Sequence, residues 1–427
     1  MAPATSASLP IFSMPSVVPE SAPIVTGIGV ATGFGYGKEA LRAGLFTGRN
    51  VFDVMHRPGR QNPDWGSAYV GIEVPDPPTV LAQRVARTTG LTGLMGAAVL
   101  DEAWREADLG GVDPTRIGLV VGGSNLQSRE HLLTGQAYAT RPAFMPPRQG
   151  CAFLDTDLCG LWTSAFDIRG FAYTVGGASA SGALAVLHAA EAVRSGRVDA
   201  CIAIGALQDL SSFDCQALSA VGAMGSERFA GEPARACRPF DRGRDGFIFG
   251  ESCAALVIRK NDGGSAGERN YGSITGGAHI ADGTRGPNPS LEGEVRVIHA
   301  ALAAARLRPD EVDYLNAHAT GTPLGDDTEV AAYHATGLTR ARINATKSII
   351  GHGLSSAGAV EMAAVLLQMR DRRLHPTRNL DDPIDPGLLW VTGAPEDHTI
   401  RNALKLSFGF GGINVALVVR SPEEPHP

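Results

Sequence analysis

The sequence of 427 residues is long enough for two or three domain-sized units. Apolar residues make up 44% of it and charged residues 19%, which is the composition of an ordinary globular protein and argues against disorder. The formal net charge is −7 and no long run of Lys or Arg is present, which argues against nucleic acid as the main partner. No apolar run reaches about eighteen residues, so we expect no membrane-spanning helix and no membrane partner.

The two ends of the chain and its cysteines give little sign of chemistry. Residues 1–23 are rich in Ser, Ala and Pro and contain neither Lys nor Arg, so we expect a disordered tail in a cytoplasmic protein rather than a secretory signal. A second short tail is expected at 421–427. None of the six cysteines forms a C-x-x-C pair. We therefore expect buried free thiols, with no disulfide and no metal site. No bound cofactor is expected either.

The first half of the chain alternates between short apolar runs and helical patterns. The elements expected there are a strand at 24–30, a helix at 38–47, a loop at 51–79, a helical stretch at 80–109, a strand at 117–122, an irregular segment with helix fragments at 123–170, a strand at 173–175, a helix at 180–195, and strands at 200–205 and 254–258. This order predicts a mainly parallel sheet covered by helices.

The pattern restarts after a polar, Gly-rich boundary at 261–270. The elements expected after it are a strand at 273–275 that ends in a turn, a helix at 293–306, a strand at 312–315, a helix at 326–336, a strand at 343–347, a helix at 358–370, and strands at 403–407 and 415–419. We infer two α/β halves of similar construction, 24–262 and 263–420, which indicates a duplicated fold.

One serine stands where a strand meets a helix. The strand ending at Val175 is followed by Gly176, Gly177 and Ala178, and then by Ser179 at the expected helix N-terminus. Free backbone N–H groups at that place favour developing negative charge. Taken alone, Ser179 is explained as an ordinary N-cap. The hydrolase signature G-x-S-x-G is not met, because Ser181 replaces its second glycine, and we expect Ser181 to pack or cap in the first helical turn.

Three further tracts place polar side chains after expected strands or in Gly-rich turns. They are Asn316-Ala-His318-Ala-Thr320-Gly-Thr322, Lys347-Ser-Ile-Ile-Gly-His352 with Glu361 nine residues on, and Phe408-Gly-Phe410-Gly-Gly-Ile-Asn414. Paired histidines also suit a metal site, but no third ligand is evident in the sequence.

Together with 177–182, these tracts resemble the motifs of the β-ketoacyl synthases in order and in approximate spacing, and the resemblance runs from about residue 24 to residue 420. These enzymes condense acyl units in fatty acid and polyketide assembly. The resemblance implies a thiolase-like α/β fold, in which two similar βαβ-rich halves stack in five layers, usually as a homodimer.

The resemblance also implies roles for single residues. His318 and His352 donate hydrogen bonds to a thioester carbonyl oxygen, and Lys347 and Glu361 maintain the geometry and electrostatics of that pair. The remaining implied residues bind the substrate. Thr320 and Thr322 contact the phosphopantetheine arm of a carrier protein, Phe410 gates the pocket and forms an oxyanion hole with the N–H of Ser179, and Phe408 and Asn414 line the same site.

The sequence departs from the family at one decisive place, since Ser179 stands where these enzymes carry a nucleophilic cysteine. A serine hydroxyl is a much weaker acid than a thiol and needs a neighbouring base to become a nucleophile. We expect both histidines to be committed to the carbonyl oxygen, so that Ser179 is acylated poorly while enolate formation is preserved. This combination resembles the free-standing homologues in polyketide β-branching cassettes, which decarboxylate malonyl-acyl carrier protein to acetyl-acyl carrier protein.

Two alternatives remain open. A synthase could condense or initiate chains through acyl-Ser179, or the chain could be a non-catalytic partner like the chain-length factors. The expected partner is an acyl carrier protein bearing malonyl-phosphopantetheine, whereas a chain-length-factor-like chain would pair with an active synthase. Because carrier proteins are acidic, Arg84, Arg87 and Arg141 are docking candidates, and solvated surface arginines are the alternative explanation.

Overall fold

The computed structural model describes residues 22–61, 64, 68–225, 227–261 and 269–422. The tail expected at 1–23, the boundary expected at 261–270 and the tail expected at 421–427 lie largely outside the described residues. The division into halves at 262 therefore stays a prediction.

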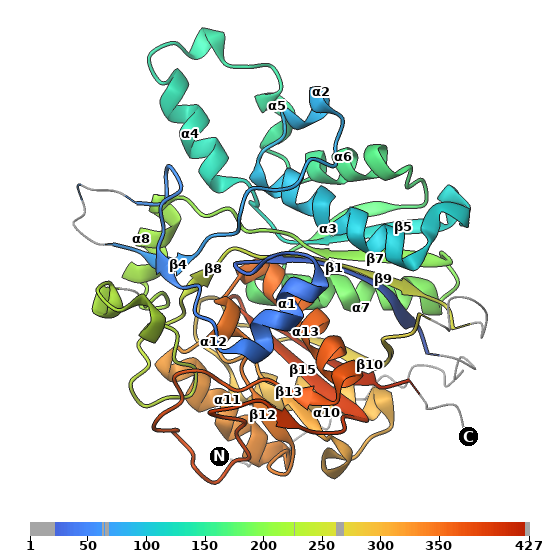
Figure 1. Cartoon of the computed structure of the whole chain (residues 1–427), viewed down its shortest axis with the longest axis vertical. Coiled ribbons are helices and arrows are strands. Elements are labelled where there is room, and N and C mark those ends of the chain that lie inside the picture. The colour runs from blue at the N-terminus through green and yellow to red at the C-terminus, as the bar shows by residue number, and fades with distance from the viewer. Residues whose placement is uncertain (1–21, 62–63, 65–67, 226, 262–268, 423–427) are drawn as a thin grey trace, which may run out of the picture.

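One mixed sheet of eleven strands runs through the described part of the chain (Figure 1). Its strands follow the order β12 (Arg342–Asn344), β11 (Tyr314–Asn316), β15 (Asn402–Gly409), β16 (Ile413–Arg420), β10 (Gly272–Ala281), β1 (Ile24–Thr32), β9 (Cys253–Arg259), β7 (Ala200–Gly205), β5 (Ile117–Gly122) and β6 (Ala172–Val175), and β2 (Gly35–Tyr36) pairs with β1. The five strands from β6 to β1 and the five from β12 to β10 follow the same order, 3-2-4-5-1 by position along the chain. This repeated order is the signature of a duplicated unit.

Helices divide the molecule into five layers (Figure 1). Helices α7 (Ser181–Arg194) and α13 (Ala357–Asp371) pack against each other between the two halves of the sheet. On the outer faces, α3 (Leu91–Ala107) and α6 (Thr156–Phe166) cover the first half, while α10 (Leu291–Ala305) and α11 (Pro323–Thr336) cover the second. All residues of α13 from 357 to 369 are buried, as expected for a helix that is covered on every side.

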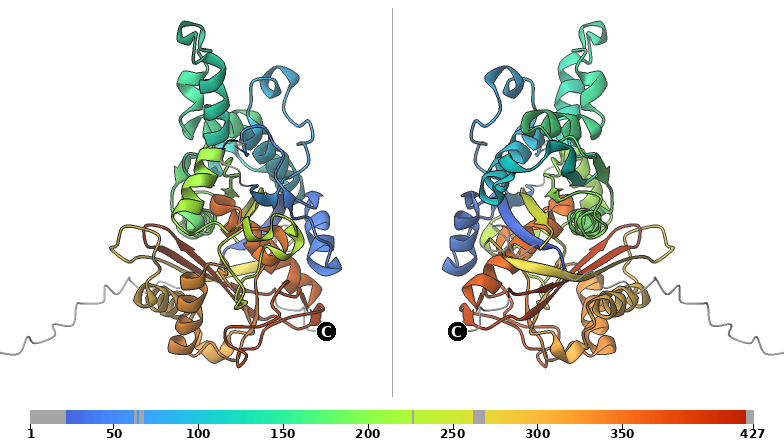
Figure 2. Two further views of the ribbon diagram at one scale, coloured as in Figure 1. Left: turned by 90° about the vertical axis from the view of Figure 1, so that its left-hand side faces the viewer. Right: turned by 90° about the vertical axis from the view of Figure 1, so that its right-hand side faces the viewer.

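The remaining elements are short or peripheral. They are α1 (Lys38–Thr47), α2 (Gln83–Ala86), α4 (Ser128–Tyr138), α5 (Gln149–Ala152), α8 (Ser212–Ala220), α12 (Lys347–Ile350), β3 (Asp53–Val54), β4 (Val70–Ile72), β8 (Phe249–Gly250), β13 (Arg373–Leu374) and β14 (Glu396–Asp397). The segment from α4 to α5 projects from the body of the molecule (Figure 2). No helix among the described residues combines the length and the apolar character that crossing a membrane requires.

The expectation of a mainly parallel sheet is wrong. Only the outer strands of each half are parallel, and every pairing from β15 through β7 is antiparallel. One cause is the tight connection between β15 and β16, where Gly411 and Gly412 adopt positive φ and reverse the chain at once. The strand predicted to turn at 276–278 instead continues to Ala281. At Gly276 a side chain would collide with α10, since a Cβ there would lie 2.6 Å from the backbone N of Ala305.

Two predicted element boundaries are also wrong. The helical stretch at 80–109 breaks between α2 and α3, where the hydroxyls of Thr88 and Thr89 donate to the carbonyl of Val85 and Gly90 is extended. The strand predicted at 343–347 ends at Asn344, and Lys347 begins α12. The six cysteines are unpaired, and all except Cys151 are buried.

The contact between α7 and α13 depends on glycines, which gives a first prediction. A Cβ on Gly358 would lie 2.3 Å from the backbone N of Ala183, so Gly358→Ala forces the two central helices apart. We expect the free energy of unfolding to fall by about 1–3 kcal/mol, the usual cost of overpacking a core.

Urea unfolding of both variants measures this effect. The matched control is Gly160→Ala in α6, where a Cβ would meet nothing within 4 Å and should stabilise the helix by up to about 1 kcal/mol. Equal stability changes in the two variants would contradict the packing argument.

Candidate active site

The turn that carries Ser179 is held by its own hydrogen bonds. The Ser181 hydroxyl accepts from the N–H of Gly177 at 2.9 Å and donates to the carbonyl of Ala178 at 2.8 Å. Ala178 has a φ of 46°, a conformation that costs free energy for a residue other than glycine. Gly409 lets β15 approach, since a Cβ there would lie 2.1 Å from the carbonyl oxygen of Gly177. Ser179 is thereby presented at a fixed place, 8% exposed.

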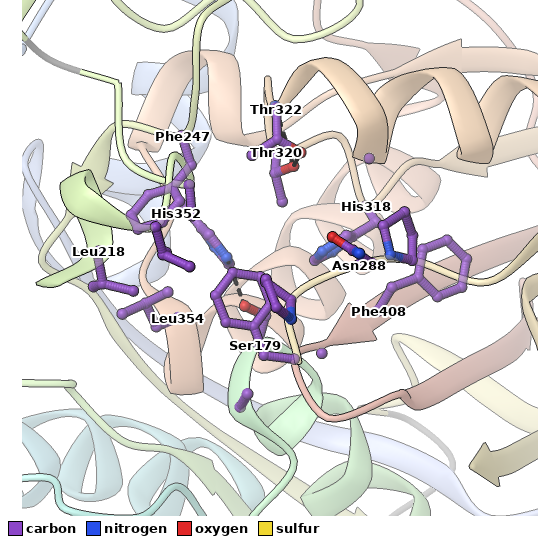
Figure 3. A pocket seen from close by; sticks show the side chains of 18 of the residues that line it. Ser179, Leu218, Phe247, Asn288, His318, Thr320, Thr322, His352, Leu354 and Phe408 are labelled. Atoms are coloured by element: carbon purple, nitrogen blue, oxygen red, sulfur yellow. Dashed lines mark hydrogen bonds between the residues drawn. The ribbon is translucent and has the colours of Figure 1, made fainter. Parts of the chain in front are cut away.

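The turn opens into a cavity of about 670 Å³ (Figure 3). Residues expected at the site from all four motif tracts line this cavity, namely Ser179, His318, Thr320, Thr322, His352, Phe408, Phe410 and Asn414. Its remaining wall is largely apolar and includes Leu218, Phe247 and Leu354, which lie around His352 in Figure 3. The sequence motifs thus meet in one place, although they come from both halves of the sheet.

His352 lies directly beside Ser179, with its Nε2 2.8 Å from the serine Oγ. Its backbone is fixed because its N–H donates to the carbonyl of Ile248 and its carbonyl accepts from the N–H of Gly250. Its Nδ1 is buried and has no hydrogen-bond partner among the described residues. Leaving an N–H unpaired there would cost more than leaving a lone pair unpaired, so we assign the proton to Nε2, which donates to Ser179.

His318 presents its Nε2 to the cavity. Its Nδ1 lies 3.4 Å from the ammonium of Lys347, which can only donate, so Nδ1 is the acceptor and Nε2 carries the proton. The two imidazole rings lie nearly perpendicular with centroids 5.8 Å apart. The rings of Phe408 and His318 pack in a T-shaped arrangement with a centroid distance of 5.5 Å. Two N–H donors therefore lie in the same cavity.

Both imidazoles are neutral near pH 7. Burial lowers the pKa of His318 and of His352 well below the ordinary histidine value, and the nearby ammonium of Lys347 lowers both further. A neutral imidazole donates one N–H without bringing a mobile charge. Such donors are suited to stabilise an oxyanion as it forms.

Lys347 and Glu361 lie behind the histidines rather than in the cavity. The Lys347 ammonium is 1% exposed, donates to the carbonyl oxygen of His318 and lies 2.5 Å from Glu361 Oε1. The second oxygen of Glu361 lies 2.5 Å from the ammonium of Lys405, which is fully buried in β15. Lys405 was not predicted from the sequence, although a lysine between Leu404 and Leu406 in an apolar strand was the available signal.

Two buried carboxyl groups were also missed. Glu329 in α11 accepts from the backbone N–H groups of His318 and Ala319, at 2.6 and 2.7 Å, and so fixes the loop that carries this histidine. Glu294 in α10 lines the cavity, and burial raises its pKa well above the ordinary value, with Glu329 adding to the shift. A glutamate within a helical pattern is usually solvated, so nothing in the sequence marks Glu329 and Glu294 as buried.

The expected substrate-binding residues differ in their surroundings. The hydroxyls of Thr320 and Thr322 lie 2.9 Å apart on the cavity wall, and Phe410 is 39% exposed. The Asn414 side chain donates to Asp282 at 2.7 Å. The Asn414 amide is therefore occupied within the wall, and the two threonine hydroxyls pair with each other.

Comparisons with known proteins match both halves of the chain. The β-ketoacyl synthase N-terminal domain matches residues 23–263, and the β-ketoacyl synthase C-terminal domain matches residues 271–381. The chain belongs to the β-ketoacyl synthase family. This membership and the structural likeness below confirm the expected thiolase-like α/β fold.

Individual proteins also match nearly the whole chain. The polyketide biosynthesis malonyl-ACP decarboxylase PksF of Bacillus subtilis is 50% identical over 404 residues, which is 94% of this chain and 97% of that protein. A 3-oxoacyl-[acyl-carrier-protein] synthase 2 of Coxiella burnetii is 29% identical over 93% of this chain and 97% of its own. The crystal structure of a β-ketoacyl synthase from Burkholderia phymatum is 25% identical, with a TM-score of 0.84, and the match covers 94% of this chain and all of that one.

The three docking candidates lie outside the cavity that contains Ser179. Arg84 and Arg87 are exposed on and next to α2. Arg141 is exposed on the projecting segment, with its guanidinium 5.4 Å from the ring centroid of Tyr138. None of the three lines the cavity. Their docking role stays a prediction.

The depressed histidine pKa values predict acid sensitivity. Below about pH 6.5 the unfolded chain protonates His318 and His352, whereas the folded protein does not. The unfolded state then binds more protons, so the free energy of unfolding falls as the pH drops, by up to about 1.4 kcal/mol per pH unit for each group.

Urea unfolding at a series of pH values between 7 and 4 measures this slope. In His318→Gln one of these groups is gone, so the loss of stability with acid should be shallower than in the wild type. Buried His375, whose pKa burial lowers to about 4, contributes equally to both proteins. Parallel curves for the two proteins would show that the His318 ring does not stay neutral in the fold.

Proposed function

We propose that this protein decarboxylates malonyl-acyl carrier protein to acetyl-acyl carrier protein in polyketide biosynthesis. The observation that carries the proposal is the pair of neutral imidazole N–H donors, on His318 and His352, that meet beside Ser179 in one cavity. The 50% identity to PksF of Bacillus subtilis, named a malonyl-ACP decarboxylase, supports the same activity.

The geometry accounts for the chemistry in two steps. The bond between the α-carbon and the carboxylate breaks, CO2 leaves, and its electron pair collects as an enolate on the thioester oxygen. The Nε2–H of His318 stabilises that oxygen, and the Nε2–H of His352 does the same once the substrate oxygen replaces the Ser179 hydroxyl as its acceptor, each by a few kcal/mol. Water then protonates the α-carbon and gives the acetyl thioester. The apolar walls formed by Phe408 and Phe410 desolvate the carboxylate and favour its loss as CO2.

The phosphopantetheine arm of the carrier protein delivers the malonyl group. Thr320 and Thr322, whose hydroxyls lie on the cavity wall, are its proposed contacts. The N–H groups of Ser179 and Phe410 form the proposed oxyanion hole. A homodimer, a cytoplasmic location and a place in a β-branching cassette remain predictions from the family resemblance.

The contact between Ser179 and His352 adds to the sequence-based expectation. We expected both histidines to be committed to the substrate oxygen, yet His352 Nε2 contacts the Ser179 hydroxyl. The tautomer assigned above makes His352 the donor in this contact, and a donor cannot take the serine proton. The contact therefore orients Ser179 without activating it.

One alternative draws on the same contact. If His352 carried its proton on Nδ1, Nε2 would be a base 2.8 Å from the Ser179 hydroxyl, and the protein would condense acyl groups through acyl-Ser179. A non-catalytic role as a chain-length-factor-like partner is disfavoured by the buried Lys347–Glu361 pair, because buried ion pairs are weak sources of stability.

Decarboxylation is tested with malonyl-carrier protein alone, without an acyl acceptor. Mass spectrometry of the carrier protein should show conversion to the acetyl form. His318→Ala should slow this conversion by about 10²–10³-fold, the usual loss for one oxyanion donor. An unchanged malonyl carrier with the wild-type protein, or equal rates for the variant, would refute the proposal. An acyl-protein adduct and a β-ketoacyl product would favour the condensing alternative.

A second prediction concerns Ser179→Cys. A thiol at a helix N-terminus ionises far more readily than a hydroxyl, so the variant should form an acyl-enzyme with an acyl-carrier protein, which the wild type should not. Intact-protein mass spectrometry detects the gain of one acyl group. A wild-type protein that is acylated as fast as the variant would contradict the inert role of Ser179.

A further inference from the structure

A second buried ammonium lies under the site without belonging to any of the motifs. Lys405, in the middle of β15, is fully buried. Its Nζ contacts oxygen atoms from three residues, namely Glu361 Oε2 and Ser407 Oγ, both at 2.5 Å, and the carbonyl of Leu406. A buried lysine is expensive unless it is paired, so this position needs a reason beyond strand formation.

Glu361 connects this ammonium to the site. One carboxylate oxygen contacts Lys405 and the other contacts Lys347, so the group is held from both sides. Lys347 directs its remaining hydrogens to the carbonyl and to the Nδ1 of His318. Without Lys405 the Glu361 carboxylate would keep one partner and could turn about its broad terminal torsion, and Lys347 would follow it.

The tautomer of His318 depends on this chain of contacts. Nδ1 stays unprotonated because an ammonium donates to it, which leaves the proton on Nε2 in the cavity. If Lys347 moved away, the Nδ1–H tautomer would become accessible, and Nε2 would offer a lone pair where a donor is needed. We propose that Lys405 is a positioning residue that holds Glu361 and Lys347 in place and thereby keeps the Nε2–H of His318 directed at the substrate oxygen.

The functional consequence rests on the proposed decarboxylation, but the effect on the tautomer does not. The titratable groups that face this cluster from the surrounding elements are Glu361, Lys347, Glu329, His318, His352, His375 and Tyr314. Burial lowers the pKa of Lys405 to about 8, against the attraction of Glu361. The wild-type arrangement should therefore weaken above about pH 8, where Lys405 loses its charge.

The test compares the wild type with Lys405→Ala in the full chain. ¹⁵N NMR of the histidine rings reports the tautomer without any substrate. We expect His318 to be the Nε2–H form in the wild type and a mixture with the Nδ1–H form in the variant. Turnover of malonyl-carrier protein should fall about 10–100-fold in kcat with little change in KM, the range typical of residues that orient a functional group from behind. Ammonium chloride, but not choline chloride at the same ionic strength, should restore both signals.

The matched control is Lys38→Ala. Lys38 also pairs with two carboxylates, Glu102 and Glu106, but these carboxylates are not part of the cluster around Glu361. This variant should leave the tautomer and the turnover unchanged. If Lys405→Ala fails to fold, Lys405→Met fills the same space without the charge, and the wild-type tautomer measured from pH 7 to 10 needs no variant.

The outcomes separate the inference from the proposed function. A wild-type protein without decarboxylase activity, in which Lys405→Ala still shifts the tautomer, would refute the function and support the positioning role. An unchanged His318 tautomer in a folded Lys405→Ala or Lys405→Met variant would overturn the positioning role.

Discussion

The Glu361 carboxylate lies between two buried ammonium groups, and the geometry of the site depends on this contact. Removing such charges from water costs several kcal/mol for each ion, and only close pairing offsets the cost. The cluster is therefore a poor source of stability. What it provides is an immobile positive field beneath two imidazole rings, which adds to the effect of burial in keeping both rings uncharged and leaves their N–H groups as donors.

Much of the fold could be predicted from the sequence, because long apolar runs and helical patterns fix local structure. The helix at 38–47 and the strands at 117–122 and 200–205 have the bounds expected. Strand direction could not be predicted in this way, because it depends on which distant strands become neighbours. The break before Leu91 was missed because the apolar pattern continues across it, while two threonine hydroxyls and Gly90 interrupt the helix locally.

The candidate site was predictable to the extent that its residues stand in recognisable tracts. Ser179, His318 and His352 were singled out in this way and lie in one cavity. Glu329 lies buried on a helix, where a single carboxyl residue carries no pattern, whereas Lys405 interrupts an apolar strand and could have been singled out. The contact between Ser179 and His352 could not be predicted from the sequence either, because a distance of 2.8 Å between residues 173 positions apart depends on the packing alone.

The packing of α7 on α13 has a consequence for how this architecture tolerates recombination. Ser179 precedes α7 in one half of the sheet, whereas His352 precedes α13 in the other, and their separation is set where Gly358 meets Ala183. A chimera built from halves of two homologues has to inherit matching small residues on both facing helices. Otherwise each half would be well formed, but the Ser179 hydroxyl and the His352 imidazole would no longer lie within hydrogen-bonding distance.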